Sequence, residues 1–230
     1  MRFGSRMGVC GMVGGLCVMF GGGLGPAHRD GFLMLADFEG QEPRIDPLSG
    51  EWRTVNDNIM GGRSKGGGEI RDGVMVFAGS TNTNGGGFSS VRASDKRWDV
   101  SAFDGIAARV RADGRTYVFH LDTGRRYRNG NVFYRGRFDT ARLITAGGER
   151  ETGVADAEGV EDGWQHVFVR FEDFLPMVRG RVVDFEPLER DRIRGIGLMI
   201  DDGLDGPFRL EADWIHAETE EHHEGQSVER

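Results

Sequence analysis

Short runs of alternating apolar residues, separated by turn residues, most constrain the fold of this 230-residue chain. In the segment Tyr117–Leu121 every second side chain points to the same face if the segment is a strand, and no stretch shows a convincing helical period. About nine or ten such runs are bounded by Gly, Asp and Asn. They include residues 32–38, 74–78, 87–91, 106–110, 117–121, 132–138, 164–171, 196–200 and 208–214. The pattern predicts an all-β fold, an antiparallel β-sandwich or jelly roll.

Glycine supports this prediction, because it accounts for 38 of the 230 residues. That share is well above the usual ~7%, yet the chain lacks the three-residue repeat and the proline content of collagen. Each glycine inside a helix costs up to ~1 kcal/mol, so the composition favours many turns over long helices. The 15 Phe and 4 Trp residues supply a core that a disordered chain would lack.

The charge balance narrows the classes of partner. Lys and Arg number 29 against 37 Asp and Glu, which gives a formal net charge of −8. A protein that neutralises nucleic-acid phosphates carries a basic patch or a basic net charge. We therefore expect no nucleic-acid partner.

Residues 1–27 have the pattern of a secretory signal peptide. Arg2 and Arg6 form a positive start, residues 7–24 form an apolar but glycine-rich run, and Gly25–Ala27 fit a cleavage site. This predicts an exported protein, periplasmic or extracellular. The alternatives are an uncleaved segment and a cytoplasmic or mitochondrial location.

Both cysteines, Cys10 and Cys17, lie inside this segment. A cleaved chain would have no disulfide, zinc–thiolate site or cysteine nucleophile. No other stretch approaches the ~18 apolar residues of a membrane helix, so we expect no membrane span in the mature chain.

The remaining chain divides into one domain and two polar segments. Residues 31–216 contain the predicted strands and form the predicted β-sandwich domain. Residues 141–163 hold few large apolar side chains and are predicted to form a long surface loop. Residues 217–230 are acidic and are predicted to be a disordered tail. The pair His222 and His223 could attract a metal, but a solvated tail is the favoured interpretation.

The densest polar motif spans residues 52–64. Asn56 and Asp57 can hydrogen-bond to nearby backbone, and Gly61 and Gly62 permit positive φ or close backbone approach. Met60 among these residues either plugs the end of the sandwich or forms an exposed contact.

A second polar cluster spans residues 82–92. Its Arg92 could bind a carboxylate, either of a ligand or of Asp57 in the same fold. The two clusters together give the predicted binding surface. Its residues are Asn56, Asp57, Met60, Gly61, Gly62, Arg63, Ser64, Ser89 and Arg92.

Catalytic and metal motifs are weak. His120 and His166 lie in predicted strands, where a solvent-facing or singly hydrogen-bonded role is commoner than that of a general base. The sequence contains no nucleophile elbow, phosphate loop or HExxH motif. We therefore predict no catalytic residues, no resident metal and no cofactor.

Carboxylates of the first and last strands leave one metal alternative open. A structural Ca²⁺ would suit their oxygen ligands, although turn formation is the favoured explanation of the acidic residues. The residues concerned are Asp37, Glu39, Asp201, Asp202, Asp205, Glu211 and Asp213. Among the aromatic side chains, Tyr127 is the best candidate for an exposed contact with a sugar.

The motifs resemble those of the NADH:ubiquinone oxidoreductase (complex I) intermediate-associated protein 30 family. The resemblance runs from about residue 35 to residue 215. It is carried by residues 52–64, 86–92, 109–115, 164–167, 179–181, 196–198 and 206–215. It implies a galactose-binding-like jelly roll similar to some carbohydrate-binding modules. It also implies a role like that of the best-known members, which help assemble respiratory complex I as chaperones or scaffolds and are not known as enzymes.

Two features depart from the family pattern. Arg170 stands where members usually have Pro, and residues 141–163 intervene where members usually pass directly to the next motif. We predict a non-enzymatic module that binds a protein partner, such as respiratory-complex subunits, while a membrane complex is assembled. The alternative is a carbohydrate-binding module of an exported protein, with a glycan as its ligand.

Overall fold

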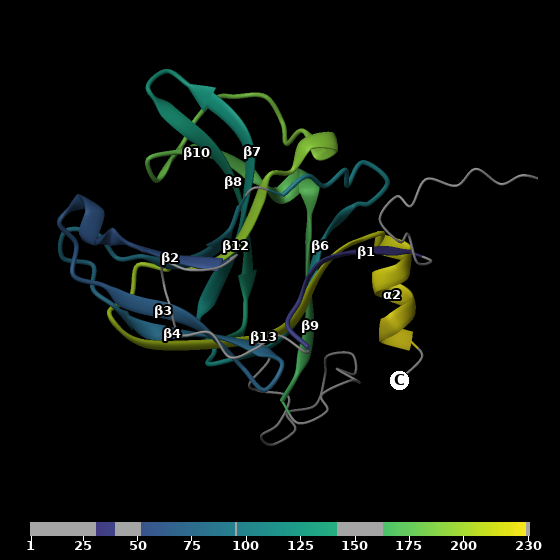
Figure 1. Ribbon diagram of the computed structural model, residues 1–230, viewed down its shortest axis with the longest axis horizontal. Helices are drawn as coiled ribbons and strands as arrows, with labels where there is room; N and C mark the ends of the chain where they lie inside the picture. The colour runs from purple at the N-terminus through teal and green to yellow at the C-terminus, as the bar shows by residue number, and fades with distance from the viewer. Residues whose placement is uncertain (1–30, 40–51, 95, 142–162, 229–230) are drawn as a thin grey trace, which may run out of the picture.

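The computed structural model describes residues 31–39, 52–94, 96–141 and 163–228, which form two antiparallel sheets packed face to face (Figure 1). The predicted antiparallel β-sandwich is confirmed. The predicted leader, residues 1–27, and residues 142–162 of the predicted surface loop lie outside the described residues. Within the described residues, no helix is long and apolar enough to cross a membrane.

The first sheet has six strands, in the order β3-β4-β13-β6-β9, with β1 paired to β13. The last strand, β13, is the centre of this sheet. Its first half pairs with β4 and its second half with β1, while β6 pairs along its other side. The bounds are β1 Phe32–Asp37, β3 Lys65–Arg71, β4 Val74–Thr81, β6 Gly105–Ala112, β9 Gln165–Arg170 and β13 Gly206–Glu218.

The second sheet has seven strands, in the order β11-β10-β8-β7-β12-β5-β2. Its bounds are β2 Trp52–Asn56, β5 Ser89–Ala93, β7 Thr116–Tyr127, β8 Gly130–Asp139, β10 Leu175–Val178, β11 Arg181–Val182 and β12 Gly195–Ile200. Short 3₁₀ helices connect strands at η1 Asp57–Met60, η3 Phe171–Asp173 and η4 Arg190–Arg192.

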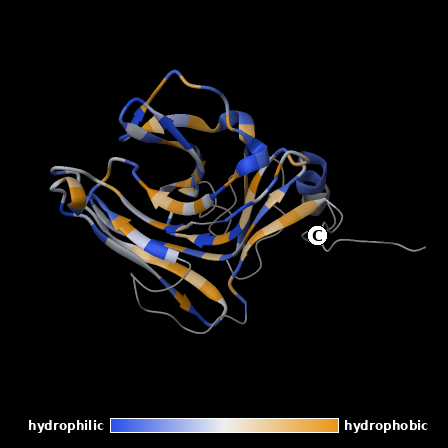
Figure 2. Cartoon of the chain, turned by 45° about the horizontal axis from the view of Figure 1, so that its top comes forward, coloured by the Kyte–Doolittle hydropathy of each residue, from blue (hydrophilic) through white to orange (hydrophobic). Residues whose placement is uncertain are grey.

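The core lies between the sheets and follows the alternation of the strands, which Figure 2 shows as alternating hydropathy. Phe77 and Leu210 enter it from the first sheet, and Phe119, Leu121 and Leu198 enter it from the second. All five are completely buried. Burial of such side chains contributes about 1.5–3 kcal/mol each and fixes the register of the strands, because a slip of one residue would expose them.

The glycine run of β3 explains how one edge of the sandwich closes. Gly66 and Gly68 belong to β3, and the predicted strands did not include this segment. A side chain at Gly66 would meet Ser89 and Phe208, and one at Gly68 would meet Val91. Glycine therefore lets β3 approach β5 of the opposite sheet closely.

The predicted disordered tail is wrong for residues 217–228. Residues 217 and 218 end strand β13, and helix α2 follows over Glu220–Val228. Thr219 caps the helix, because its Oγ1 accepts a hydrogen bond from the His222 amide (3.3 Å). Acidic residues in the first turn also favour the helix N-terminus.

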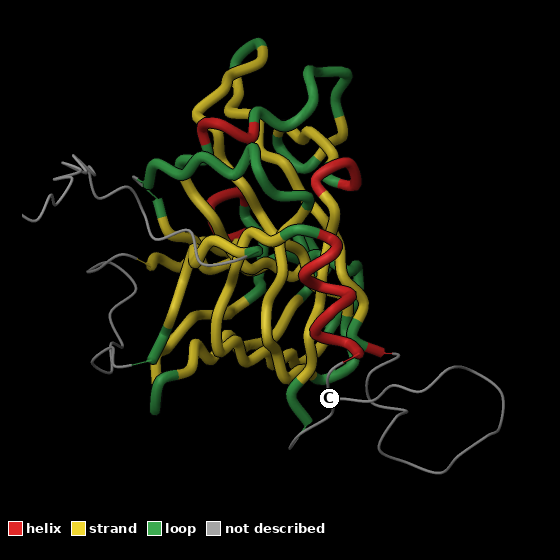
Figure 3. The backbone as a smooth tube through the Cα atoms, turned by 90° about the vertical axis from the view of Figure 1, so that its right-hand side faces the viewer, coloured by secondary structure: helices red, strands yellow, loops and turns green. Residues whose placement is uncertain are grey.

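Helix α2 covers the outer face of the first sheet (Figure 3). This face is aromatic. His216 stacks on Trp214 (ring centroids 3.8 Å apart) and on Phe32 (4.4 Å). The helix adds His222 against Phe32 and His223 against Phe168. These contacts order a segment that has too few apolar residues to suggest packing from its own sequence.

Candidate functional site

The predicted polar turn, residues 56–64, is organised around the buried side chain of Asp57. This carboxylate is completely buried at the start of η1. It accepts hydrogen bonds from the Ser64 amide (3.0 Å), the Ser64 hydroxyl (2.6 Å), the Gly87 amide (2.6 Å) and the Phe88 amide (3.4 Å). Burial alone would raise the pKa of Asp57, but the donors at Ser64, Gly87 and Phe88 outweigh it and lower the pKa.

Two glycines are required around this carboxylate. A Cβ on Gly62 or Gly86 would collide with the Asp57 side chain. Gly61 has a φ of 86°, which ends η1 in the left-handed conformation. The turn is therefore a tight shell of backbone around one charge. Asp57 and Ser64 hold the two polar clusters together rather than face a ligand.

The exposed part of the turn is apolar. Ile59 is 74% exposed and Met60 is 60% exposed, so Met60 does not plug the end of the sandwich, and its role as a contact stays a prediction. Surface apolar side chains fixed on a short helix are a common feature of interaction sites.

A groove on the outer face of the second sheet lies beside these two residues. It has a volume of about 400 Å³. Its rim is formed by η1 and by the β10–β11 turn, and its floor by β5, β8 and β12. The lining residues are Val55, Ile59, Met60, Gly86, Gly87, Phe88, Arg92, Gly130, Asn131, Phe133, Arg135, Met177, Arg179, Gly180, Met199, Asp201 and Gly203.

Positive charge predominates in the groove, although the whole chain is acidic. Arg92, Arg135 and Arg179 line it against a single acidic residue, Asp201. Asp201 is already paired with Arg135 (2.8 Å) and Arg137 (2.8 Å). The groove therefore has guanidinium groups in excess of its own carboxylates, which suits an anionic group on a ligand.

Arg92 is the least compensated of these arginines. Its Nε donates to the Ser90 hydroxyl (3.0 Å), and its guanidinium lies 5.5 Å from the centroid of the Phe133 ring. Among the described residues it forms no ion pair, so the predicted pairing with Asp57 is wrong. Burial, with the charges of Arg135 and Arg53, lowers its pKa to about 10, so it remains protonated at neutral pH.

His120 lies beneath these arginines on β7. The ring is 2% exposed, packs at a tilt against Phe133 (4.5 Å between centroids) and has no hydrogen-bond partner for either nitrogen among the described residues. Burial, together with Arg92, Arg135 and Arg53, holds its pKa well below the ordinary value. His120 is therefore uncharged at neutral pH and lies beneath the floor of the groove. The positive charge of the groove comes from the arginines.

The structure divides the nine predicted residues into four groups. Met60 and Arg92 line the groove. Asn56, which donates to the Gly66 carbonyl (3.0 Å), and the shell of Asp57, Gly62 and Ser64 support it from inside. Gly61 and Arg63 are exposed beside the turn, and Ser89 is completely buried.

Sequence reasoning missed Ile59, Phe133 and Arg135 as site residues. Their signal is present in the strand alternation, because Phe133 and Arg135 alternate with the core residues Val132 and Tyr134 of β8. The pattern identifies that outer face, but it does not tell which outer faces are hollowed.

The carboxylates considered for Ca²⁺ are mostly engaged with arginines. Asp202 pairs with Arg115 (2.6 Å), and Asp213 pairs with Arg109 (2.7 Å). Glu211 pairs with two arginines, and Asp205 accepts a hydrogen bond from the Thr83 amide (2.6 Å). A calcium ion would have to displace guanidinium groups that already satisfy these oxygens.

Tyr127, the sequence candidate for contact with a sugar, is half-buried. It packs edge-on against Phe185 (5.6 Å) and adjoins the core. Among the described residues, the large apolar side chains with high exposure are Met34, Ile59, Met60, Leu175, Val182 and Leu204. None of them is aromatic, and the rings that line the groove, Phe88 and Phe133, are half-buried.

Comparison with known proteins supports the resemblance. Residues 36–212 match the family described as Complex I intermediate-associated protein 30. A mitochondrial protein of that name from Mus musculus is 33% identical over 129 residues, which are 55% of this chain and 34% of the mouse protein. The protein of that name from Drosophila melanogaster is 28% identical over 166 residues, 66% of this chain and 47% of its own length. The chain therefore spans less than half of these relatives.

Solved structures confirm the fold. The family 11 carbohydrate-binding module of the cellulase Lic26A-Cel5E from Clostridium thermocellum matches with a TM-score of 0.52 and 16% identity, over 82% of this chain and 95% of the module. A solution structure of CtCBM11 matches with a TM-score of 0.51 and 17% identity, over the same shares. At such low identity the likeness shows the β-sandwich alone.

Proposed function

The chain belongs to the Complex I intermediate-associated protein 30 family, and from that membership we propose that it is a non-enzymatic protein that binds a partner during the assembly of a membrane protein complex. The partner that we propose is a subunit of a respiratory complex. The observation that places this proposal on a surface is Arg92, which is half-buried, has no ion-pair partner among the described residues and lies in the same groove as the exposed Ile59 and Met60.

The chemistry of the groove favours a polypeptide segment. Buried arginines beside apolar anchors are typical of the residues that dominate protein–protein binding energy. An acidic side chain of the partner would pair with Arg92, and a neighbouring apolar side chain would pack on Met60. Charge complementarity of this kind raises association rates and selects among partners.

The relatives also bear on the compartment. Both are mitochondrial proteins by name, which supports the mitochondrial alternative and gives no support to the predicted export. We therefore propose that the protein meets its partner where the peripheral parts of respiratory complexes are assembled. Fractionation of the producing cells, followed by detection of the chain beside respiratory subunits, tests the compartment. Recovery in the secreted or periplasmic fraction would contradict it.

Site-specific crosslinking tests the proposed surface. A photo-crosslinking residue at position 59 is placed in the full chain, and crosslinked proteins are identified after irradiation in its own cells. We expect crosslinks to a respiratory-complex subunit. The double variant Met60→Ser with Arg92→Gln should weaken binding of the purified subunit at least about tenfold.

The matched control is Leu204→Ser. Leu204 is 59% exposed and does not line the groove, so this variant should bind like the parent chain. Equal binding by the double variant and the control would contradict the groove as the binding surface. Recovery of bound glycan with no reproducible protein would replace the proposal with the carbohydrate-binding alternative.

A further inference from the structure

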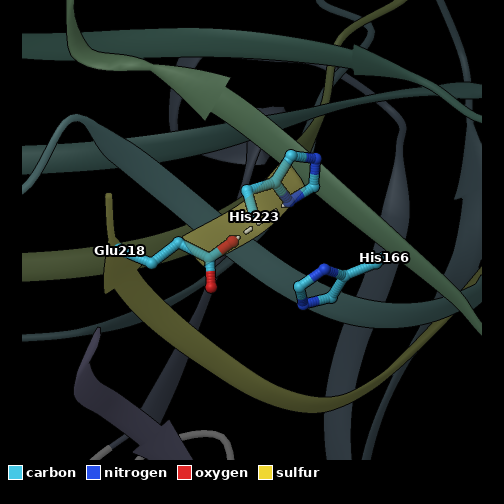
Figure 4. A group of neighbouring side chains, drawn as sticks. All are labelled: His166, Glu218 and His223. Carbon is cyan, nitrogen blue, oxygen red and sulfur yellow. Dashed lines mark hydrogen bonds and ion pairs between the residues drawn. The ribbon is translucent and has the colours of Figure 1, made fainter. Parts of the chain in front are cut away.

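Three side chains from separate elements meet on the face of the sandwich opposite the groove. His166 comes from β9, Glu218 from the last residue of β13, and His223 from helix α2 (Figure 4). Each can offer one ligand atom, and these atoms all lie within 4.8 Å of one another. The cluster joins residues separated by up to 57 positions in the sequence only because α2 folds back over the first sheet.

Glu218 is the residue that requires an explanation. It is completely buried. Its Oε1 lies 3.1 Å from His223 Nδ1, but its Oε2 has no hydrogen-bond partner among the described residues. Burying a carboxylate oxygen without a donor costs free energy, because the group loses its hydrogen bonds to water and gains none in their place. In Figure 4 one oxygen of Glu218 is directed to His223 and the other projects away from that contact, with His166 on the far side of the cluster.

Aromatic packing holds the imidazoles in place. The His166 ring contacts the edge of Trp214 (4.7 Å between centroids) and stacks on His223 (5.2 Å). The Phe168 ring also stacks on His223 (4.6 Å). An apolar shell of this kind limits ring rotation and excludes water, and both effects support metal ligation.

The donor set identifies the class of ion. Two imidazole nitrogens and one carboxylate oxygen form the ligand set of zinc sites that keep a fourth position for water. With bonds of about 2.0–2.1 Å, two donors on a tetrahedral ion lie about 3.3 Å apart, so small rotations of the side chains close the cluster. A cavity of about 330 Å³, lined by His223, Glu224 and Phe168 among others, adjoins the cluster and gives the ion a route from solvent.

We propose that His166, Glu218 and His223 bind a divalent transition-metal ion, with zinc as the best fit, and that this ion clamps helix α2 to the first sheet. The ion would neutralise the buried carboxylate and connect β9, β13 and α2. The site is independent of the groove, so the metal proposal and the partner proposal are tested separately.

Metal titration of the full chain tests the site. The protein is stripped with a chelator and dialysed, and zinc chloride is then added while heat of binding, bound zinc and thermal unfolding are measured. We expect one zinc per chain and a rise in melting temperature that a chelator reverses, because a ligand that binds only the folded state stabilises it. Cobalt(II) in place of zinc should give the strong visible absorption of a tetrahedral site.

His223→Gln removes one ligand at the half-buried end of the cluster and should weaken zinc binding at least about tenfold. His222→Gln is the matched control, because it removes the neighbouring imidazole of the same helix, which lies outside the cluster. Far-ultraviolet circular dichroism of both variants without metal verifies that they are folded. Failure of the parent chain to bind zinc, or an equal loss in both variants, would overturn the site.

Discussion

Single residues with buried charge determine the shape of the proposed binding surface. Asp57 accepts hydrogen bonds from four donors in two segments, at Ser64 and at Gly87–Phe88, and in doing so it fixes the position of η1 over the groove. Arg92 has the opposite character, because it is half-buried in a groove that carries few acids. The charge of Asp57 is satisfied within the fold, whereas that of Arg92 is the one proposed to pair with a ligand.

Removing the Asp57 carboxylate should unfold the rim. We expect Asp57→Ala to lower the free energy of unfolding by about 3 kcal/mol or more, because four buried donors lose their acceptor. Urea unfolding followed by tryptophan fluorescence measures the change. Asp205→Ala is the control, since Asp205 also accepts a backbone hydrogen bond but is exposed, and its urea midpoint should hardly move. A small effect of Asp57→Ala would show that the turn holds without its central charge.

His120 should make the fold sensitive to mild acid. Its pKa is far below the ordinary value of 6.5, so between these two values the unfolded chain binds a proton that the folded chain refuses. Stability is therefore complete above about pH 6.5 and falls as the pH decreases below it. Urea midpoints at pH 7 and pH 5 measure the slope, which should be smaller in His120→Gln. The groups facing His120 are Arg92, Arg135 and Arg53, which stay charged throughout. An unchanged slope in the variant would contradict this account.

The sequence identifies two segments that lie beside the groove but only part of the chemistry there. It predicts that residues 56–64 and 82–92 act together, and the structure joins them through Asp57. It assigns Asp57 and Ser89 to a binding surface, whereas both are buried. Turn propensity depends on local hydrogen bonding, so it cannot tell whether a polar side chain turns toward solvent or toward backbone 30 residues away.

The secondary-structure elements agree with the prediction where apolar alternation is clear. They differ from it where tertiary contacts determine the element. The alternating runs that become β6, β7, β8 and β12 agree with the prediction. The prediction misses strand β3, because its glycines carry no apolar pattern and the strand is defined by its pairing with β4. The prediction also misses helix α2, because the helix is ordered by contacts with an aromatic sheet face that is distant in sequence.

Arg115 connects several of these elements, and its substitution tests how much this connection contributes to stability. The Arg115 guanidinium donates to Asp202, to Thr81 and to the carbonyls of Leu204 and Gly206 at the start of β13. The hydrogen bond to Asp202, together with the charge of that carboxylate, raises the pKa of Arg115. Arg115→Lys keeps the charge but not the planar fork, so we expect a loss of about 1–3 kcal/mol in unfolding free energy. Arg71→Lys is the control, because its pairing with Glu69 is exposed. Equal melting temperatures for the two variants would contradict a linking role.

On the scale of the whole molecule, the two outer faces of the sandwich are used differently. The outer face of the second sheet holds the open, arginine-lined groove. On the outer face of the first sheet, α2 covers the part beside β1 and β9, which includes the aromatic stack of Phe32, Trp214 and His216. That part of the face is therefore unavailable to a partner while the helix stays in place.

Removing the helix should expose a second apolar face. We expect a chain that ends at Thr219 to melt at a lower temperature and to self-associate, because large exposed apolar patches promote association. Size-exclusion chromatography with light scattering measures the mass, and differential scanning calorimetry measures the melting temperature. A truncated chain that remains monomeric and equally stable would show that the helix contributes nothing to the sheet that it covers.

The central position of β13 has a consequence for synthesis. Strand β1 pairs with β13 across nearly the whole described chain, with Phe32 opposite Glu218, and β13 also separates β4 from β6. Strands β1, β4 and β6 each lack a neighbour until β13 has left the ribosome. Contacts this distant in sequence form slowly and leave nascent strand edges open to other chains. The first sheet therefore closes only once β13 is available, and until then the exposed edges of its early strands favour association with other chains.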